Sequence, residues 1–259
     1  MSVTEREYID EESFDAAAQE LLTVPLEQLR LADNAWKKFD KPCPPGNTYV
    51  YAVQLLGDIR EKRVLDYGCG DGSFSVILAK RGGLVWGFDT SGISIQVAQR
   101  RAAANDVGDR VHFEKMSAYK IGYEDETFDL VIGLDILHHV EIGKTAPEIA
   151  RVLKKTGRAI FLEPLAASKG LQFIRRFVPV AVAIHEGSQE RQLTYQDVDD
   201  LARHFSRVAC KEFQIFSRLD RVVGNKPIRR WLNLWDHWLL ETFPALRRYA
   251  RQIVIELWK

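Results

Sequence analysis

The sequence predicts an α/β fold: a doubly wound, mostly parallel seven-stranded sheet with an antiparallel edge strand, plus N-terminal helices and helical insertions. Two observations support this fold class. Between residues 63 and 163, short apolar segments alternate with amphipathic helical ones, which is typical of a parallel sheet covered on both faces. The chain then closes on two further strand patterns separated by a long connection, which indicates an antiparallel addition to the edge of the sheet.

The elements of the core follow in order along the chain. The opening is polar and then helical, and the segment KPCPPGN at 41–47 ends that pattern. The residues spaced to line one face of this first helix are Leu21, Leu22, Leu26, Leu29 and Trp36. The predicted strands are Arg63–Tyr67, Leu84–Phe88, Val111–Glu114, Phe128–Gly133 and Arg158–Glu163. The helices predicted between them are Ser73–Lys80, Ile93–Ala104 and Pro147–Leu153.

Beyond Glu163 the alternation stops at an apolar and basic helical segment, LQFIRRFVPVAVAI at 171–184. Thr194 then caps a helix with acidic residues in its early turns. The remaining predictions are a strand over Arg207–Phe216, a helical insertion over Leu219–Tyr249 and a last strand over Arg251–Lys259.

Composition limits the classes of function. The 259 residues have a net charge of zero and a pI near 7.0, so no global attraction to nucleic acid is expected. Cys43, Cys69 and Cys210 lack CxxC spacing, which argues against a disulfide framework or a zinc site. The N-terminus lacks a signal-peptide pattern, and no apolar run approaches about 20 residues. We expect a cytoplasmic protein, with peripheral membrane contact and oligomeric state left open.

The segment VLDYGCGDGSFS at 64–75 places three glycines directly after the first predicted strand. Glycine permits positive φ and lacks the Cβ that would block a ligand, and the helix beginning near Ser73 points N–H groups into the same space. In an open parallel sheet, this loop is where the backbone meets a ligand. A tight strand-to-helix turn also needs glycine for steric reasons alone, so the triplet by itself leaves both explanations open.

A second acidic position favours a ligand. Asp89, in GFDTS, ends the second strand about 20 residues beyond the glycines, the spacing at which a carboxylate binds ribose hydroxyls. A dinucleotide requires GxGxxG, whereas this chain has GxGxG preceded by Asp66. A carboxylate there would repel a pyrophosphate but attract the ammonium group of an amino-acid moiety. The pattern therefore favours S-adenosylmethionine over NAD.

VLDYGCGDG resembles the first motif of class I S-adenosylmethionine-dependent methyltransferases, whose fold is Rossmann-like. FDT, FDLVIGLDILHHV and LKKTGRAIFLEP resemble later motifs of the superfamily in the same order. The resemblance covers roughly Arg63–Pro164 and is strongest to the small-molecule group that includes ubiquinone-pathway and natural-product methyltransferases. It implies one domain over 1–259, with a helical cap at 1–60, a cofactor-binding core at 61–165, and helical insertions at 166–193 and 218–249 near the acceptor site.

The resemblance also implies roles for individual residues. Asp66 and the backbone of Gly68, Cys69, Gly70 and Gly72 would hold the methionine part of the cofactor. Asp89 would bind the ribose, Thr90 and Ser91 would flank the adenine, and Leu134 and Asp135 would lie against the sulfonium region. Asp135 is also explained as a cap for the segment after its strand.

The adenine contact departs from the family pattern. An aspartate commonly follows the third strand there, and the corresponding residue is Ser117, within EKMSAYK. Serine can still accept a hydrogen bond, and Met116 can pack against the adenine face, with Ala118 beside them.

His138 and His139 follow the fourth strand and are candidates for the general base, because imidazole titrates near neutrality. Family members often have a histidine that packs under the loop at the position of His139, so catalytic and structural roles both stay open. Glu163, His185 and Glu186 are further candidates. No acidic cluster has the spacing of a catechol-type magnesium site, so we expect no metal.

These observations predict transfer of a methyl group from S-adenosylmethionine to an oxygen or nitrogen of a small, hydrophobic molecule by in-line displacement. Two alternatives remain: a noncatalytic partner subunit that binds the cofactor, and a peripheral membrane lipid or quinone methyltransferase. An oxidoreductase fits the fold but not the GxGxG turn, and GLDILHHV lacks the asparagine-proline-proline-aromatic motif of nucleic-acid and protein methyltransferases.

A tryptophan-rich segment lies outside these motifs. Trp231, Trp235 and Trp238 recur at helical spacing. The arginines that flank them are Arg229, Arg230, Arg247 and Arg248. The tryptophans either pack a helical cap onto the sheet or contact a membrane interface or a hydrophobic, anionic acceptor.

Overall fold

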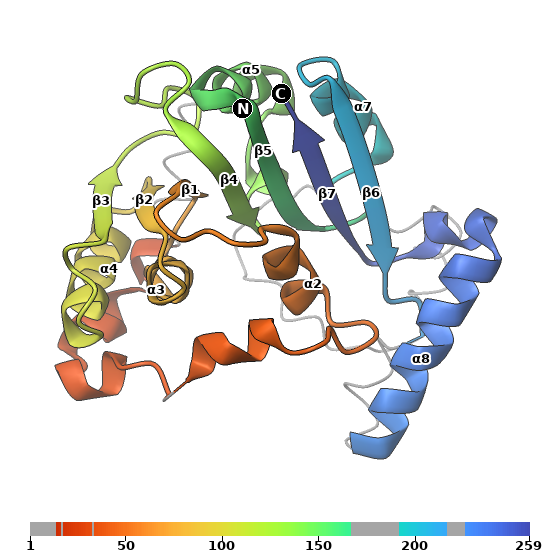
Figure 1. Cartoon of the computed structure of the whole chain (residues 1–259), viewed down its shortest axis with the longest axis horizontal. Coiled ribbons are helices and arrows are strands. Elements are labelled where there is room, and N and C mark those ends of the chain that lie inside the picture. Colours follow the sequence, from red (N-terminus) through yellow and green to blue (C-terminus); the bar gives the residue numbers. More distant parts are fainter. Residues whose placement is uncertain (1–13, 17, 33, 167–191, 217–225) are drawn as a thin grey trace.

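The computed structural model describes residues 14–16, 18–32, 34–166, 192–216 and 226–259. Its strands form a seven-stranded sheet in the order β3-β2-β1-β4-β5-β7-β6 (Figure 1). The strands are β1 (Arg63–Tyr67), β2 (Leu84–Asp89), β3 (Val111–Lys115), β4 (Phe128–Leu134), β5 (Leu153–Pro164), β6 (Arg207–Phe213) and β7 (Gln252–Trp258). Helices lie on both faces of the sheet (Figure 1), so the predicted doubly wound α/β fold is confirmed.

The sheet is parallel from β3 to β5, and β7 runs antiparallel to both of its neighbours. The antiparallel strand lies one place in from the edge, between β5 and β6. The central strands read as nearly continuous apolar runs because both of their faces are covered. β4, with the sequence FDLVIGL, has five of its seven residues buried.

The helices follow the predicted order. The α-helices are α2 (Thr48–Leu55), α3 (Ser73–Lys80), α4 (Gly92–Ala104), α5 (Ile142–Val152), α7 (Tyr195–Ala202) and α8 (Lys226–Thr242). The 3₁₀ helices are η1 (Leu26–Leu29), η2 (Ala35–Asp40), η3 (Leu137–His139) and η5 (Pro244–Tyr249). Thr194 caps α7 as predicted: its hydroxyl accepts from the Asp197 N–H, and the Asp197 carboxylate accepts from the Thr194 N–H.

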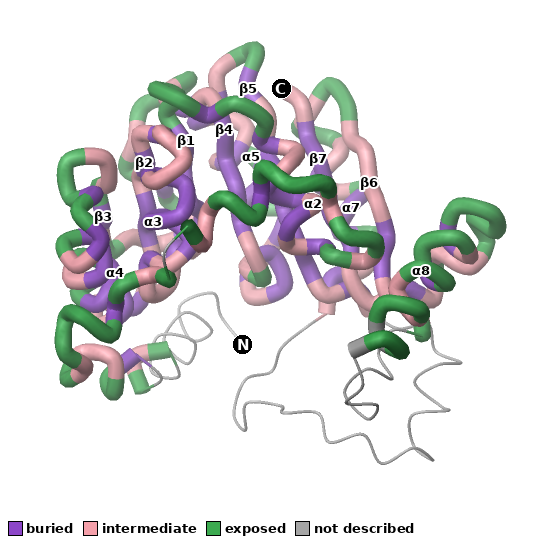
Figure 2. Tube along the Cα trace, turned by 60° about the horizontal axis from the view of Figure 1, so that its bottom comes forward, coloured by how far each residue is buried: buried purple, intermediate pink, exposed green. Residues whose placement is uncertain are grey.

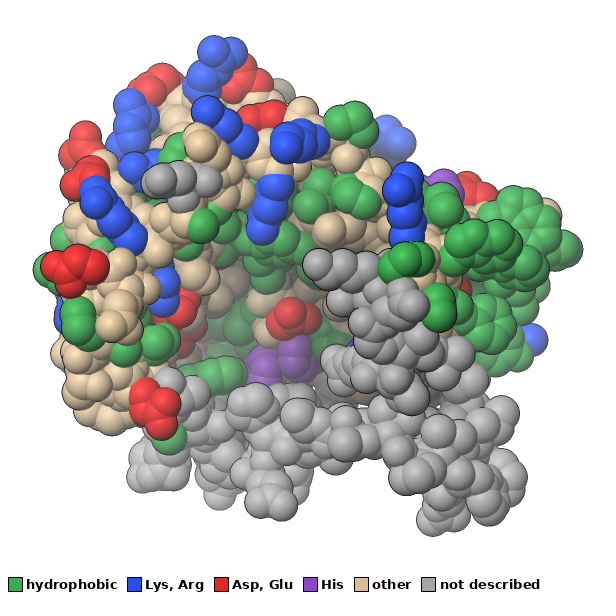
Figure 3. Space-filling model, turned by 90° about the horizontal axis from the view of Figure 1, so that it is seen from below, with side chains coloured by type: hydrophobic (Ala, Val, Ile, Leu, Met, Phe, Trp, Pro, Cys, Tyr) green, Lys and Arg blue, Asp and Glu red, His purple; other side chains and the backbone are tan. Residues whose placement is uncertain are grey.

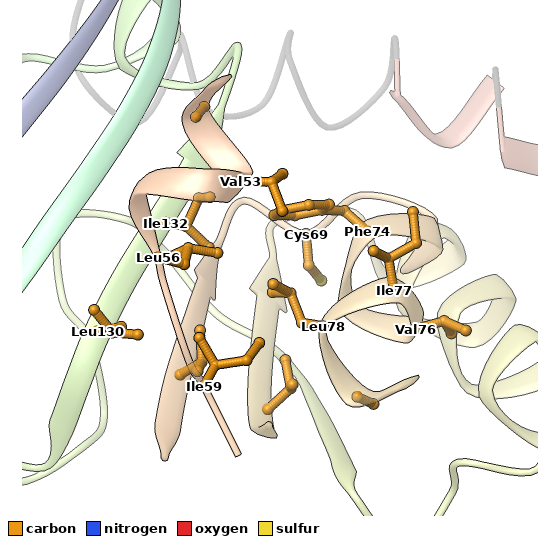
Figure 4. Packing of buried hydrophobic residues seen from close by; sticks show 14 of the residues in the cluster. Val53, Leu56, Ile59, Cys69, Phe74, Val76, Ile77, Leu78, Leu130 and Ile132 are labelled. Carbon is orange, nitrogen blue, oxygen red and sulfur yellow. The ribbon is translucent and has the colours of Figure 1, made fainter. Parts of the chain in front are cut away.

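Two apolar clusters hold the helices to the sheet. One joins α2, α3 and α4 to one face, and the other joins α5 and α7 to the opposite face. Figure 4 shows the first cluster, in which Val53 of α2 and Leu56, just after α2, lie over the sheet with Phe74 and Leu78 of α3. The buried strands appear as the purple centre of Figure 2. These clusters fix the strand ends, and hence the loops that form the site.

The N-terminal pattern does not form one helix. Residues 14–16 and 18–23 are helical, and two short 3₁₀ helices, η1 and η2, follow. Pro25 precedes η1 with an extended ψ, and Asn34 adopts a left-handed φ of 63° before η2. Because the chain turns at both points, Leu29 is buried while Leu26 is exposed, and the predicted common face is wrong.

Helix α5 begins five residues before the predicted start at Pro147. Proline within a helix removes one N–H donor, and the carbonyl that loses its partner here belongs to Gly143. Gly143 is exposed, so water can serve that carbonyl. β5 also begins earlier than predicted, at Leu153, with a register irregularity against β4 between Phe128 and Leu130.

Some predictions lie outside the described residues. These are the helical segment at 171–184, the candidates His185 and Glu186, and the first part of the insertion predicted from Leu219. The described remainder of that insertion is helical, as α8 and η5.

Candidate functional site

A cavity of about 180 Å³ opens at the carboxyl ends of β1, β2 and β4. Figure 3 views the molecule from the side toward which β4 points in Figure 1, and this side is hollowed, with acidic and histidine side chains at the centre of the hollow. The cavity is lined by Phe14, Gly68, Gly70, Phe88, Asp89, Thr90, Ser94, Ala118, Tyr119, Leu134, Asp135, Ile136, His139 and Val140. Its position matches the switch point of an open α/β sheet, where β1 has β2 on one side and β4 on the other.

The three glycines after β1 all have positive φ but meet different surroundings. A Cβ at Gly68 would lie 2.7 Å from Ile136, and one at Gly72 would lie 2.6 Å from the Cβ of Ala98 on α4. A Cβ at Gly70 would meet nothing within 4 Å. Close packing therefore excludes a side chain at Gly68 and Gly72. At Gly70, the missing side chain instead leaves open space at the cavity.

Asp89 joins the two loops at the carboxyl ends of β1 and β2. Its Oδ2 accepts the Gly70 N–H at 2.9 Å and its Oδ1 accepts the Ser91 N–H at 2.9 Å. Burial raises the pKa of this carboxyl, and the hydrogen bonds from backbone N–H groups oppose that rise. Each carboxylate oxygen keeps a second lone pair, so Asp89 can still accept hydrogen bonds from a ligand in the cavity.

Asp66 lies under the glycine loop and is not among the lining residues. It is 2% exposed, and its Oδ2 accepts the Ser75 hydroxyl at 2.5 Å. Burial raises the pKa of Asp66 to about 7, and the charge of Asp89 adds to the rise while the Ser75 hydrogen bond opposes it. Ser75 is a neutral partner for this carboxylate. The ammonium group predicted to face Asp66 would supply the positive charge that favours its ionised form.

Cys69 contributes backbone rather than side chain. Its N–H donates to the Phe88 carbonyl at 2.9 Å, and its side chain points into the apolar cluster of Figure 4. Burial raises the pKa of the thiol well above its usual value, which argues for an inert, packed side chain.

Thr90 and Ser91, both predicted beside the adenine, differ in position. Thr90 lines the cavity. Ser91 is fully buried and caps α4, because its hydroxyl oxygen accepts the Ser94 N–H at 2.9 Å. The Ser91 hydroxyl also donates to the carboxylate of Asp15.

The loop after β3 brings a different set of side chains than predicted. Ala118 lines the cavity, but Met116 and Ser117 do not. The Met116 sulfur accepts the Gly122 N–H at 3.1 Å, and the Ser117 hydroxyl accepts the Tyr119 N–H at 3.1 Å. The cavity wall here is instead the ring of Tyr119, whose hydroxyl accepts the Glu141 N–H at 3.1 Å.

Leu134 and Asp135 at the end of β4 both line the cavity. Asp135 adopts a left-handed φ of 55°, uncommon for a residue with a side chain, and its N–H donates to the Leu162 carbonyl at 2.8 Å. The 3₁₀ helix η3 that follows is preceded by Ile136 and has no side-chain cap among the described residues. The alternative role of Asp135 as a cap is therefore not seen there.

Glu163 organises the loop after β4. This fully buried carboxylate accepts the N–H groups of Ile136 at 2.9 Å and Leu137 at 2.8 Å on one oxygen. Its other oxygen accepts two hydrogen bonds from His138, one from the ring Nδ1 at 2.8 Å and one from the backbone N–H at 3.3 Å. Because the ionised carboxylate is only an acceptor, Nδ1 of His138 carries the hydrogen. Glu163, predicted as a possible base, is enclosed by these donors.

The rings of His138 and His139 pack at a tilt of 40° with centroids 4.1 Å apart, but the two residues occupy different environments. His138 is 6% exposed beside Glu163, whereas His139 lines the cavity. The ring of Phe14 packs edge-on against His139 with centroids 5.4 Å apart. Phe14 and Asp15 thus tie the N-terminal helical segment to His139 at the cavity and to Ser91 at the start of α4.

Several cavity residues carry no signal in the sequence motifs. Ile136 and Val140 sit inside the FDLVIGLDILHHV segment, where their apolar side chains read as core residues. Phe14 is more than fifty positions before Gly68, so no local pattern indicates that it reaches the cavity. Among the described residues, no group of three or more histidine, cysteine, aspartate or glutamate side chains is arranged to hold a metal ion.

Comparison with known proteins gives the following matches. A family model described as a methyltransferase domain matches residues 65–161. A ubiquinone biosynthesis O-methyltransferase of Alkalilimnicola ehrlichii is 35% identical over 113 residues, 43% of this chain and 45% of the relative. A demethylmenaquinone methyltransferase of Lactiplantibacillus plantarum is 30% identical over 153 residues, 55% of this chain and 63% of the relative. The matched part of the chain thus spans 45% of the first relative's length and 63% of the second's, less than two thirds in both cases.

Solved structures share the fold at low sequence identity. The crystal structure of the [4+2]-cyclase SpnF superposes with a TM-score of 0.57 at 18% identity, covering 82% of this chain and 80% of that chain. This likeness concerns the fold, which by itself does not fix a reaction.

Proposed function

Residues 65–161 form a domain of the class I S-adenosylmethionine-dependent methyltransferase superfamily, and from this premise we propose a reaction for the whole protein. The protein moves the methyl group of S-adenosylmethionine to an oxygen or nitrogen of a small, hydrophobic molecule by in-line displacement. The bound cofactor supplies a methyl group that is already strongly electrophilic. The tasks left to the chain are binding, alignment and removal of a proton.

The observation that carries this proposal is the open space at Gly70 beside the Asp89 carboxylate. Gly70 is the position in the glycine loop where a ligand can meet bare backbone, and Asp89 has acceptor capacity left for ribose hydroxyls. Thr90 and Ala118 continue the cavity wall on the side proposed for the adenine, and Leu134 and Asp135 on the side proposed for the methionine. These residues suit the cofactor of the superfamily, and we propose that they bind it.

We propose that the apolar lining residues form the acceptor side of the cavity and favour a hydrophobic substrate. These residues are Phe14, Ile136 and Val140, together with the aromatic Tyr119. The names of these relatives refer to ubiquinone biosynthesis and to demethylmenaquinone, and we propose an acceptor of comparable aromatic or lipid-like character for this protein.

We propose that His139 removes the proton of the acceptor where one must leave. It is the histidine of the pair that lines the cavity. His138 acts through position: its Nδ1–H donates to Glu163, and its ring packs at a tilt against His139. We propose that this arrangement orients His139 without requiring His138 to touch the substrate.

The cofactor proposal is tested by calorimetry with S-adenosylhomocysteine and NAD. We expect the first to bind and the second not to bind, and we expect Asp89→Ala to weaken binding by about a hundredfold, because two or more hydrogen bonds to a charged group are lost. Asp109→Ala, at an exposed aspartate on the loop before β3, is the matched control and keeps full affinity. Equal affinity in both variants would refute the assigned site.

The reaction is tested by incubating phenols, quinol precursors, amino sugars and lipids with methyl-labelled cofactor. Transfer to one acceptor class, abolished in His139→Ala with unchanged S-adenosylhomocysteine affinity, supports the proposal. Tight cofactor binding without transfer to any acceptor would favour the noncatalytic partner subunit, and an acceptor used only when presented in vesicles would favour the lipid or quinone alternative.

A further inference from the structure

Helix α8 turns its apolar side away from the protein. Its exposed apolar residues, with Phe243 just beyond the helix, are here called the aromatic stripe. The stripe consists of Ile228, Trp231, Leu234, Trp235, Trp238 and Phe243, whose exposed fractions lie between 43% and 64%. Figure 2 shows α8 at the margin of the molecule beyond β6, and Figure 3 shows hydrophobic side chains gathered on that side.

A buried acid fixes this orientation. Asp236, on the opposite side of α8, is 1% exposed, and its two oxygens accept the N–H groups of Ile215 at 2.9 Å and Phe216 at 2.8 Å. Leu240, one turn later, is also buried. A surface helix usually buries its apolar face and exposes its polar one. Here the hydrogen bonds of Asp236 hold its side of α8 against the protein, which leaves the stripe exposed on the other side.

The stripe is a continuous aromatic surface. The rings of Trp231 and Trp235 stack with centroids 6.0 Å apart. Trp238 packs edge-on against Trp235 at 5.9 Å and against Phe243 at 5.9 Å. An apolar groove along the first two turns of α8 is lined by Pro227, Ile228, Trp231, Leu232 and Trp235. Exposed apolar patches of this kind mark interaction surfaces.

The charges around the stripe indicate its partner. Arg230 adjoins Trp231 and is exposed, and Arg248, also exposed, follows in η5 with its guanidinium 4.9 Å from the Tyr249 ring. The other acid of α8, Glu241, is paired with Lys211 at 3.2 Å. Tryptophans bordered by arginines suit the interface of a bilayer with anionic head groups. Within the described part of the chain, no helix has the length and apolar run to cross a bilayer.

We propose that α8 is an interfacial helix that docks the protein on membranes containing anionic lipids. The aromatic stripe enters the head-group region, and Arg230 and Arg248 contact lipid phosphates. This inference does not depend on the proposed methyl transfer, because it rests on α8 alone.

The test is flotation of the full chain with vesicles of phosphatidylcholine, with and without phosphatidylglycerol. We expect binding to the anionic vesicles that weakens as ionic strength rises. Replacing Trp231, Trp235 and Trp238 with serine should reduce binding by at least about tenfold, because their buried apolar area is lost. These side chains are exposed, so the variant keeps its fold, and Leu26→Ser, at an exposed leucine of η1, is the matched control that keeps full binding.

The charge contribution is tested separately. Arg230→Glu with Arg248→Glu should abolish the preference for anionic vesicles, while Lys37→Glu with Lys155→Glu, at two exposed lysines away from α8, should keep it. Binding that survives the triple serine replacement would overturn the proposal. A dimer seen by sedimentation velocity that the same replacement dissociates, without vesicle binding by the parent chain, would instead assign the stripe to a second copy.

Discussion

Gly70 and Gly72 lie two residues apart in the same loop and have left-handed φ values of 50° and 73°. Their side-chain positions nevertheless have different surroundings. Gly72 faces Ala98 of α4, whereas Gly70 faces the cavity. The same residue type in one motif thus serves packing at one position and ligand access at another. Asp66 and Asp89 show the same division: one is enclosed with Ser75, and the other lines the cavity.

This difference predicts opposite outcomes for two alanine replacements. Gly72→Ala should destabilise the protein by about 3 kcal/mol, because a left-handed conformation is strained for alanine and the Cβ overlaps Ala98. Gly70→Ala should cost only about 1 kcal/mol of stability, since its Cβ meets no atom, but should weaken S-adenosylhomocysteine binding about tenfold. Urea unfolding and calorimetry measure the two effects. A Gly70→Ala variant that binds normally would show that the open space is not used by the cofactor.

At the scale of elements, the loop after β4 is held by the end of the neighbouring strand β5. Glu163 accepts four hydrogen bonds from three consecutive residues, Ile136, Leu137 and His138, and so positions η3 and the histidine pair. The sheet order makes this possible, because β4 and β5 are parallel neighbours whose carboxyl ends meet. The site is therefore built by two adjacent strand ends rather than by one motif.

Glu163→Gln should lower both stability and turnover. The amide keeps one acceptor oxygen, but its NH₂ group, itself a donor, then faces the N–H donors that the second carboxylate oxygen had accepted. The lost hydrogen bonds lower the free energy of unfolding by about 2 kcal/mol. We expect a lower melting temperature and a reduced kcat with little change in cofactor affinity, since the lost contacts orient His139 rather than the cofactor loop. The control is Glu256→Gln, which weakens the ion pair between Glu256 of β7 and Arg158, whose nitrogen and oxygen are 2.9 Å apart. Neither residue lines the cavity. This variant should lower stability while leaving kcat unchanged.

At the scale of the whole molecule, segments distant in sequence close on the same site. Asp15 pairs with Ser91, 76 residues away, and Phe14 packs on His139. On the opposite flank, α8 is fixed through Asp236 with its aromatic stripe outward. The cavity and the proposed membrane surface belong to different parts of the fold, so each can be disrupted without the other.

Global stability should depend on pH through Asp66. Its pKa is raised from 3.8 in the unfolded chain to about 7 in the folded protein, so the folded state binds this proton more tightly. The stabilisation is complete below the unfolded value and is lost as pH rises through about 7, a change of roughly 4 kcal/mol. Urea unfolding of cofactor-free protein at several pH values measures the slope, which Asp66→Asn should reduce. Asp89 has its pKa raised in the same direction, so part of the slope remains. Identical slopes in both proteins would contradict this prediction.

The sequence by itself determined the elements and the loops that carry the motifs. β1 and α3 have the predicted bounds, and the acidic residues Asp66 and Asp89 lie at the predicted strand ends. Strand periodicity and glycine chemistry are local properties, so they can be recognised without knowing what packs nearby.

The tertiary structure alone decided which side chains reach the cavity and which way α8 faces. Phe14, which lines the cavity, comes from a segment more than 50 residues before Gly68, and no local pattern specifies such a contact. The tryptophan spacing fixes only that these residues share one side of a helix. That this side points outward follows from Asp236, whose burial is possible because two backbone N–H groups after β6 satisfy its carboxylate.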